Sequence, residues 1–166
     1  ILNINSNDII IMTNAVGFVA NPYKDINTLL LAFKEINQLE DYSIKLIIVG
    51  EKEENFENNF NGDIRFINPT YQSSILIDYY CSSDIYVHSS NIETWGLTIS
   101  EALSCGIPVI ASNVGAIPEQ IRGYCFDSKD SKIANINLYE IESATGILFG
   151  RNDLSSLEKA LQYLIT

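Results

Sequence analysis

The chain has 166 residues, 46% of them hydrophobic and 19% charged, a composition typical of one globular domain and unlike that of a disordered chain. Its formal net charge of -11, from 10 Lys and Arg against 21 Asp and Glu, argues against nucleic acid or an anionic membrane surface as a partner. The three cysteines are far apart and lack CxxC spacing, which predicts reduced thiols in a cytoplasmic protein and no metal site.

No segment of the chain is expected to enter a membrane. No apolar run reaches the roughly 18 residues of a transmembrane helix. The first residues also lack the basic and apolar regions of a signal peptide, and the absence of an initial Met predicts an excised fragment. The sequence leaves open whether a longer parent enzyme attaches peripherally to the inner membrane face.

Apolar runs of strand length alternate with segments of helical period, as in βαβ units. Asp25 or Asn27 is a suitable N-cap for the first helix, and Gly106 with Pro108 would end the third. Strands are expected over residues 9–17, 45–49, 64–67, 85–88, 109–112 and 146–149, and helices over about 29–36, 76–81, 97–105 and 154–164.

These elements predict a single α/β domain over residues 1–166, with a doubly wound, mainly parallel, six-stranded Rossmann-like sheet and helices on both faces. The strand order 3-2-1-4-5-6 would make the first and fourth strands neighbours, so the loops 17–24 and 89–96 should face one crevice at their carboxyl ends. Residues 122–145 mix Gly, Ser, Asp and Asn with aromatic residues, and we expect an irregular excursion there.

The loop after the fourth strand carries the chemistry. A strand ending at His88 is followed by a short loop and then by a helix starting near Gly96, an arrangement whose free N–H groups can bind a diphosphate. Glu93 precedes this helix and Glu101 lies about one turn inside it, so the two carboxylates would reach different parts of one ligand. Carboxylates suit the vicinal hydroxyls of a ribose or a pyranose.

The residues from Glu93 onward, E-x-W-G-L-x-x-x-E-A-L-S-C-G-I-P-V-I-A-S-N-V-G-A-I-P-E, resemble the donor-site signature of glycosyltransferase family 4, the retaining enzymes of the GT-B fold. The resemblance runs from about Ile10 to the C-terminus and implies the C-terminal, nucleotide-sugar-binding half of such an enzyme. The N-terminal acceptor domain would be absent from this chain, and the isolated domain would not transfer sugar.

The resemblance implies a role for each matching residue. Glu93 would contact the donor sugar near the reacting carbon, as a positioning group and not as a nucleophile. Glu101 would bind the ribose diol, and Lys24 would neutralise the leaving diphosphate. The backbone of Gly96, Leu97 and Thr98 would bind that diphosphate, the loop at Gly17 would border the donor, and the base would lie near Gly50 and Asn68.

The implied activity is transfer of a sugar from a UDP-, GDP- or ADP-sugar to an acceptor hydroxyl with retention, without a metal or other cofactor. Two departures stand out: Gly17 is followed by Phe18 where family members often carry Arg, and Lys24 by Asp25 where they often carry Gly. The alternatives are another GT-B activity, such as a nucleotide-sugar epimerase or a phosphorylase, and a module that binds a nucleotide or a protein without chemistry.

Simpler interpretations remain for single residues. Glu101 could only complement a helix dipole, and Lys24 could be a surface lysine. His88 fits a packing role in the crevice wall as well as a functional one, and Trp95 and Cys105 are interpreted as packing residues.

Overall fold

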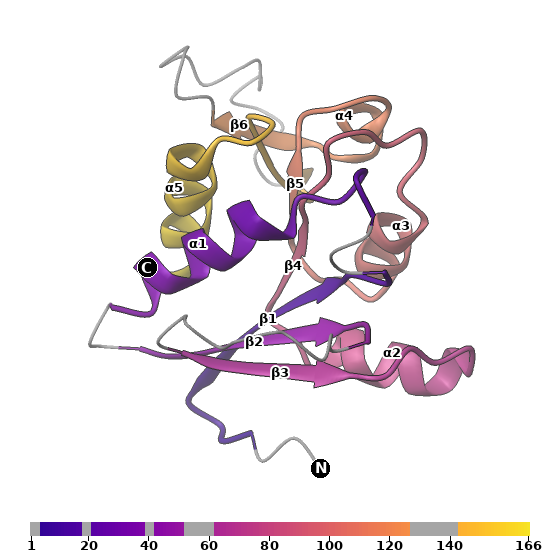
Figure 1. Cartoon of the computed structure of the whole chain (residues 1–166), viewed down its shortest axis with the longest axis vertical. Helices are drawn as coiled ribbons and strands as arrows, with labels where there is room; N and C mark the ends of the chain where they lie inside the picture. The colour runs from indigo at the N-terminus through magenta and orange to yellow at the C-terminus, as the bar shows by residue number, and fades with distance from the viewer. Residues whose placement is uncertain (1–3, 18–20, 39–41, 52–61, 127–142) are drawn as a thin grey trace.

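The computed structural model describes residues 4–17, 21–38, 42–51, 62–126 and 143–166 (Figure 1). Within these residues the chain forms seven strands and five helices. In chain order they are β1 (Asp8–Asn14), α1 (Ile26–Ile36), β2 (Ser43–Val49), β3 (Asp63–Ile67), α2 (Ser73–Cys81), β4 (Ile85–His88), α3 (Leu97–Ser104), β5 (Val109–Ser112), α4 (Ile117–Gln120), β6 (Gly123–Phe126), β7 (Gly146–Phe149) and α5 (Leu154–Ile165).

The strands form one sheet in the order β3-β2-β1-β4-β5-β7-β6. Every pair of neighbours is parallel. β1 pairs with β4 through Ile11 opposite Ile85 and Met12 opposite Tyr86, so the chain crosses from one half of the sheet to the other at this point. The predicted parallel α/β fold is therefore confirmed, and so is the predicted pairing of the first and fourth strands.

The expectation of six strands was wrong by one. The extra strand, β6, lies within the stretch 122–145 that was predicted to be irregular, and it pairs with β7 at the sheet edge. Its sequence Gly-Tyr-Cys-Phe has only four residues, of which Tyr124 and Phe126 alone are strand formers, so it carries a weak strand signal. Residues 127–142 of that stretch lie outside the described part of the chain.

Two smaller differences concern loops at the carboxyl end of the sheet. β1 ends at Asn14, and Gly17, with a φ of 72°, lies outside the strand. The short helix α4 was not predicted, since it has only four residues and contains Pro118 in its first turn. Asp25 is the N-cap of α1, as one of the two predicted alternatives, and its carboxylate accepts from Thr28 N.

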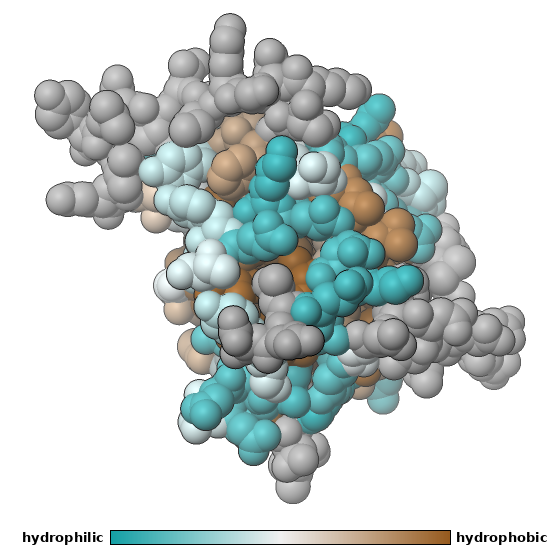
Figure 2. Space-filling model, turned by 90° about the vertical axis from the view of Figure 1, so that its left-hand side faces the viewer, coloured by the Kyte–Doolittle hydropathy of each residue, from teal (hydrophilic) through white to brown (hydrophobic). Residues whose placement is uncertain are grey.

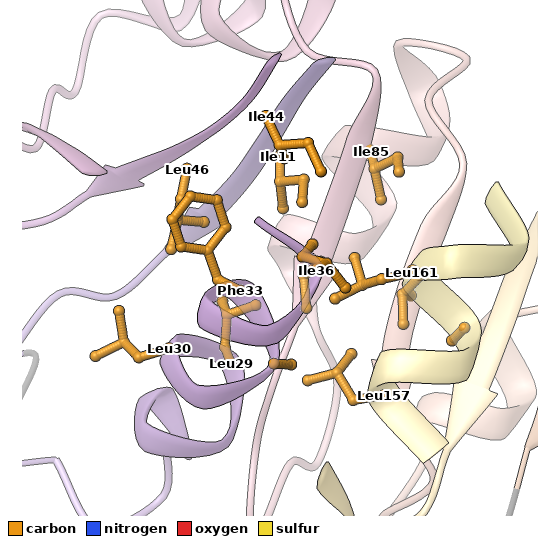
Figure 3. Packing of buried hydrophobic residues seen from close by; sticks show 14 of the residues in the cluster. Ile11, Leu29, Leu30, Phe33, Ile36, Ile44, Leu46, Ile85, Leu157 and Leu161 are labelled. Carbon is orange, nitrogen blue, oxygen red and sulfur yellow. The ribbon is translucent and has the colours of Figure 1, made fainter. Parts of the chain in front are cut away.

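Helices α1 and α5 pack together on one face of the sheet, where they bury the larger hydrophobic cluster (Figures 1 and 3). Leu29 and Phe33 of α1 point toward the strands, with Phe33 directed at Leu46 of β2. Leu157 of α5 meets α1 from the side, and each of these four side chains is fully buried. On the outside of these two helices hydrophilic residues cover most of the described surface (Figure 2).

The opposite face of the sheet packs against α2 and α3. Met12 of β1 and Tyr86 of β4 belong to this second cluster, together with Tyr80, Ile99 and Ala102 from the helices. Successive strand residues point to opposite faces, so a strand covered on both sides must be apolar throughout. This burial explains the unbroken apolar runs of the sequence. No helix in the described ranges is long and apolar enough to cross a membrane.

Leu29 and Leu31 provide a matched test of this packing, because both lie in α1 but Leu29 is fully buried and Leu31 is 45% exposed. Leu29→Ala should lower the free energy of unfolding by about 2 to 5 kcal/mol, since it leaves a cavity between α1 and the sheet. Leu31→Ala should change it by less than about 1 kcal/mol. Denaturant titration measures both values, and equal losses would contradict the packing of α1 described above.

Candidate functional site

Two loops meet beyond the carboxyl ends of β1 and β4, as predicted from the strand order. Asp25 N donates to Ser89 O (3.1 Å) and Asn91 N donates to Tyr23 O (2.8 Å), so the loop that leads into α1 is pinned to the loop that follows β4. Lys24 and Ser90 form an isolated antiparallel bridge between them. Backbone hydrogen bonds alone therefore hold the two loops in a fixed relative position.

Lys24, His88 and Glu93 form a charged cluster at this junction. Lys24 Nζ lies 3.5 Å from Glu93 Oε2 and 3.4 Å from both His88 Nε2 and Ser90 Oγ. The side chains of Lys24 and Glu93 are 21% and 20% exposed, so the ion pair is largely shielded from water. Burial lowers the pKa of Lys24, and the nearby carboxylate of Glu93 partly opposes this shift. Lys24 is thus a partly buried cation with one anionic partner among the described residues.

His88 is the most buried member of the cluster, with 3% of its surface exposed. Its Nε2 lies 3.1 Å from Glu93 Oε2 and its Nδ1 lies 3.3 Å from Thr98 Oγ1. A carboxylate only accepts hydrogen bonds, so we assign the proton to Nε2 and let Nδ1 accept from the Thr98 hydroxyl. Burial and, secondly, the charge of Lys24 lower the pKa of His88 to about 4. The imidazole is therefore neutral near pH 7.

Glu93 is held at both carboxylate oxygens. Oε1 accepts from Thr94 N (3.1 Å) and Trp95 N (3.4 Å), while Oε2 faces His88 and Lys24. Burial acts to raise the pKa of Glu93, but Lys24, His88 and the Trp95 N–H together lower it below its usual value, so the carboxylate is charged. These contacts leave Glu93 little freedom to rotate.

The loop after β5 supports the backbone of Glu93. Gly115 has a φ of 54°, and a Cβ at this position would lie 1.8 Å from Glu93 O. Only glycine allows the two loops to approach so closely. Ser112 links the same region to β4, because Ser90 N donates to Ser112 Oγ (2.7 Å) and Ser112 Oγ donates to His88 O (3.3 Å).

The N-terminus of α3 differs in one respect from expectation. Gly96 is its N-cap, but Gly96 N already donates to Gln120 Oε1 (3.0 Å), and a Cβ on Gly96 would lie 2.6 Å from Ile99 Cδ1. Gly96 therefore serves packing, and its amide is occupied. The N–H groups of Leu97 and Thr98 have no acceptor within the described residues, so these two amides are free to bind an anion.

Glu101 lies one turn further along α3, and its Oε2 accepts a hydrogen bond of 2.8 Å from the hydroxyl of Tyr80. It opens onto a groove of about 710 Å³ between α2 and α3. Ser73, Leu76, Ile77, Tyr80, Cys81, Leu97, Ser100, Ser104 and Cys105 line the rest of this groove. The motif therefore places Glu93 and Glu101 in different surroundings, as their spacing suggested.

Asn68 follows β3 and lines a separate pocket of about 450 Å³ at the carboxyl ends of β1, β2 and β3. Leu76 borders both this pocket and the groove at Glu101, so the two hollows are adjacent. Gly50 is buried beside this pocket: Gly50 N donates to Ile67 O (2.8 Å), and a Cβ would lie 2.4 Å from Ala15 O. Gly17 is exposed at the start of the loop that joins β1 to α1.

The sequence matches the family model described as glycosyl transferases group 1 over residues 5–166. The chain belongs to this glycosyltransferase family. Sulfoquinovosyl transferase SQD2 of Arabidopsis thaliana is 31% identical over 130 residues, which cover 78% of this chain and 22% of that protein. Protein CapJ of Staphylococcus aureus is 29% identical over 128 residues, covering 69% of this chain and 32% of that protein. The chain thus spans less than a third of the length of these two relatives.

Solved structures share the fold of this glycosyltransferase domain. Sucrose-phosphate synthase from Thermosynechococcus elongatus superposes with a TM-score of 0.71 at 24% identity, over 99% of this chain and 38% of that one. HepE from Anabaena, solved in complex with UDP-glucose, superposes with a TM-score of 0.68 at 17% identity, over 96% of this chain and 40% of that one. The resemblance to GT-B glycosyltransferases is confirmed, whereas membership of family 4 in particular stays a prediction.

The glycosyltransferase motif did not identify every residue of the site. Ser90 and Ser112 join the cluster only because β4 and β5 are neighbours, and Gln120 reaches Gly96 from α4. Tyr80 comes from α2. Each is a common residue type far from its partner in sequence, and no local pattern points to these contacts. His88 could have been ranked higher, because it is the chain's one histidine and ends a buried strand beside the motif.

The protonation of His88 can be measured directly, since no other histidine is present. Its ring resonances should titrate by NMR with a midpoint near 4, and not near the usual 6.5. Because the folded pKa is the lower one, the stability gained from neutral His88 is complete above pH 6.5 and is lost as the pH falls from 6.5 toward 4. Lys24→Met should raise the midpoint but keep it below 6.5, since burial remains. A midpoint near 6.5 in the unmodified chain would contradict the assigned contacts.

Proposed function

We propose that this domain binds the nucleoside-diphosphate sugar of a retaining, metal-independent glycosyltransferase that transfers the sugar to an acceptor hydroxyl. The observation that carries this proposal is the cluster of Lys24, His88 and Glu93 beyond the carboxyl ends of β1 and β4, because His88 also contacts Thr98 in the first turn of α3. Open parallel sheets bind ligands at this switch point. The complex of HepE with UDP-glucose supports a nucleotide sugar as the ligand class.

The diphosphate would bind at the N-terminus of α3. The amides of Leu97 and Thr98 point out of the helix with a partial positive charge, and Lys24 supplies a full charge close by. Both are fixed before the ligand arrives, which is the arrangement that stabilises a developing charge without reorganisation. These fixed donors support a mechanism without a metal ion.

The donor sugar would lie against Glu93. Both carboxylate oxygens of Glu93 are already held by backbone amides, His88 and Lys24, so the group is positioned to accept hydrogen bonds from sugar hydroxyls. The geometry therefore supports a positioning role for Glu93 beside the reacting carbon.

The nucleoside would extend from the diphosphate toward β2 and β3. Glu101 would accept from the ribose diol in the groove between α2 and α3, and the base would occupy the adjacent pocket at Asn68, beside Gly50. This direction follows from the positions of the two hollows, because they adjoin at Leu76. The loop at Gly17 would border the diphosphate.

The acceptor would bind to another part of the parent enzyme. The chain covers only 22% and 32% of its two relatives, which leaves most of such a protein for acceptor recognition. Transfer needs a closed site that excludes water and aligns the reactants. We also propose that this enzyme works in the cytoplasm.

The roles of the two glutamates can be separated by calorimetric titration with UDP, GDP and ADP. Glu101→Ala should weaken binding of the preferred nucleoside diphosphate by about 1 to 3 kcal/mol, the cost of losing hydrogen bonds to a charged group. Glu93→Ala should not weaken binding of the bare diphosphate, because it removes a carboxylate and leaves Lys24 in place, whereas it should weaken binding of the corresponding nucleotide sugar.

Glu119→Ala is a suitable control, because Glu119 is an exposed carboxylate in α4. Equal losses of diphosphate affinity in the Glu93 and Glu101 variants would refute the division of labour. Failure of the folded, unmodified chain to bind any of the three nucleotides would refute the proposed function itself.

The 166-residue chain alone should bind the donor but not transfer its sugar, since it would lack the surface that closes over the acceptor. Incubation with radiolabelled nucleotide sugars and candidate acceptors, in parallel with the full-length parent, measures this difference. Efficient transfer by the chain alone would show that the acceptor site lies within these residues.

A further inference from the structure

Tyr80 is a buried tyrosine of α2 whose hydroxyl reaches Glu101 of α3 on the same face of the sheet. It lies near the end of α2 with 1% of its surface exposed, and its ring packs edge-on against Tyr86 at 5.5 Å between centroids. This packing fixes the ring, so the position of the hydroxyl is determined by the core and not by solvent.

The Tyr80 hydroxyl has one proton and three polar neighbours. Asn14 Nδ2 donates to it (3.1 Å), Glu101 Oε2 lies 2.8 Å away, and Thr98 O lies 3.4 Å away. Hydrogen bonds to a charged acceptor are shorter and stronger, so the proton belongs to the bond with Glu101. Burial raises the pKa of Tyr80, which keeps the hydroxyl protonated as a donor.

Glu101 depends on this bond for its orientation. Its residue is exposed, and a glutamate on a helix surface normally samples several rotamers. Within the described residues the hydroxyl of Tyr80 is the one group that donates to the Glu101 carboxylate, through Oε2. Oε1 receives no such bond from the described residues and remains able to accept from a ligand.

We propose that Tyr80, oriented by Asn14, is a positioning residue that holds the Glu101 carboxylate in the geometry needed to bind a vicinal diol. This inference rests on the proposed function, in which Glu101 accepts from the ribose. A carboxylate that is already oriented loses less conformational entropy on binding, and the gain appears as affinity for the diol alone.

Asn14 contacts both Tyr80 and the pocket at Asn68. It ends β1 and lines the pocket at Asn68 that is assigned to the base, while its amide nitrogen bonds to Tyr80. Its Oδ1 is buried and has no hydrogen-bond partner among the described residues. Asn14 therefore connects the base pocket to the carboxylate in the neighbouring groove, and its loss should act in the same direction as the loss of the Tyr80 hydroxyl.

The test compares a ribonucleoside diphosphate with its 2′-deoxy counterpart by calorimetry on the whole chain, using whichever of UDP, GDP and ADP binds most tightly. The unmodified chain should prefer the ribose form by about tenfold, the effect of one hydrogen bond to a charged group. Tyr80→Phe should raise the dissociation constant for the ribose form about three- to tenfold and leave that for the deoxy form unchanged, so the preference nearly disappears. Asn14→Ala should also reduce the preference for the ribose form, by a smaller factor.

Tyr79→Phe is the matched control, since it removes the neighbouring hydroxyl in the same helix, and it should keep the full preference. Equal weakening of both nucleotides by Tyr80→Phe would indicate a purely structural effect and would overturn the proposal. Glu101→Gln separates the positioning role of Tyr80 from the ribose-binding role of Glu101. If this variant loses the ribose preference while Tyr80→Phe keeps it, the positioning role is refuted and the proposed function stands. If the unmodified chain shows no ribose preference, the role of Glu101 fails together with that of Tyr80.

Discussion

The parallel pairing of β1 with β4 is the constraint on which the site depends. It places the carboxyl ends of two central strands, whose paired residues are 74 positions apart in the sequence, side by side. The backbone bonds between Asp25 and Ser89 and between Tyr23 and Asn91 then fix the two loops against each other. Lys24 and Glu93 meet because of this framework, and their ion pair is a consequence of the topology and not its cause.

The fold could be predicted largely from the sequence because burial on both faces leaves a strong signal. The apolar runs in β2, β4 and β5 stand out without any knowledge of their partners. β6 carried a weaker signal because it has only four residues and includes Gly123 and Cys125. The other edge strand, β3, was predicted because Ile64, Phe66 and Ile67 are strong strand formers.

Some contacts of the candidate site could be predicted from the sequence, and others could not. Glu93 and Glu101 belong to one local motif, and Lys24 to a loop that the topology directs to the carboxyl end of β4, so the contact of Lys24 with Glu93 could be predicted. The occupation of the Gly96 amide by Gln120 could not, because it depends on a side chain from the unpredicted helix α4. The bond from Tyr80 to Glu101 depends on the packing of α2 against α3, and the sequence specifies that packing only through many small contacts.

The ion pair of Lys24 with Glu93 bears on which ligands the proposed donor site would favour. The charge of Lys24 is balanced by a carboxylate that its own backbone amides hold in place, so Lys24 by itself offers a small anion such as inorganic phosphate little net attraction. An isolated ionic contact of this kind contributes little free energy. A ligand that also reaches the amides of α3, Glu101 and the pocket at Asn68 would gain further contacts while the pair stays in place. The balanced pair would thus act as a filter that discriminates by ligand size and not by charge alone.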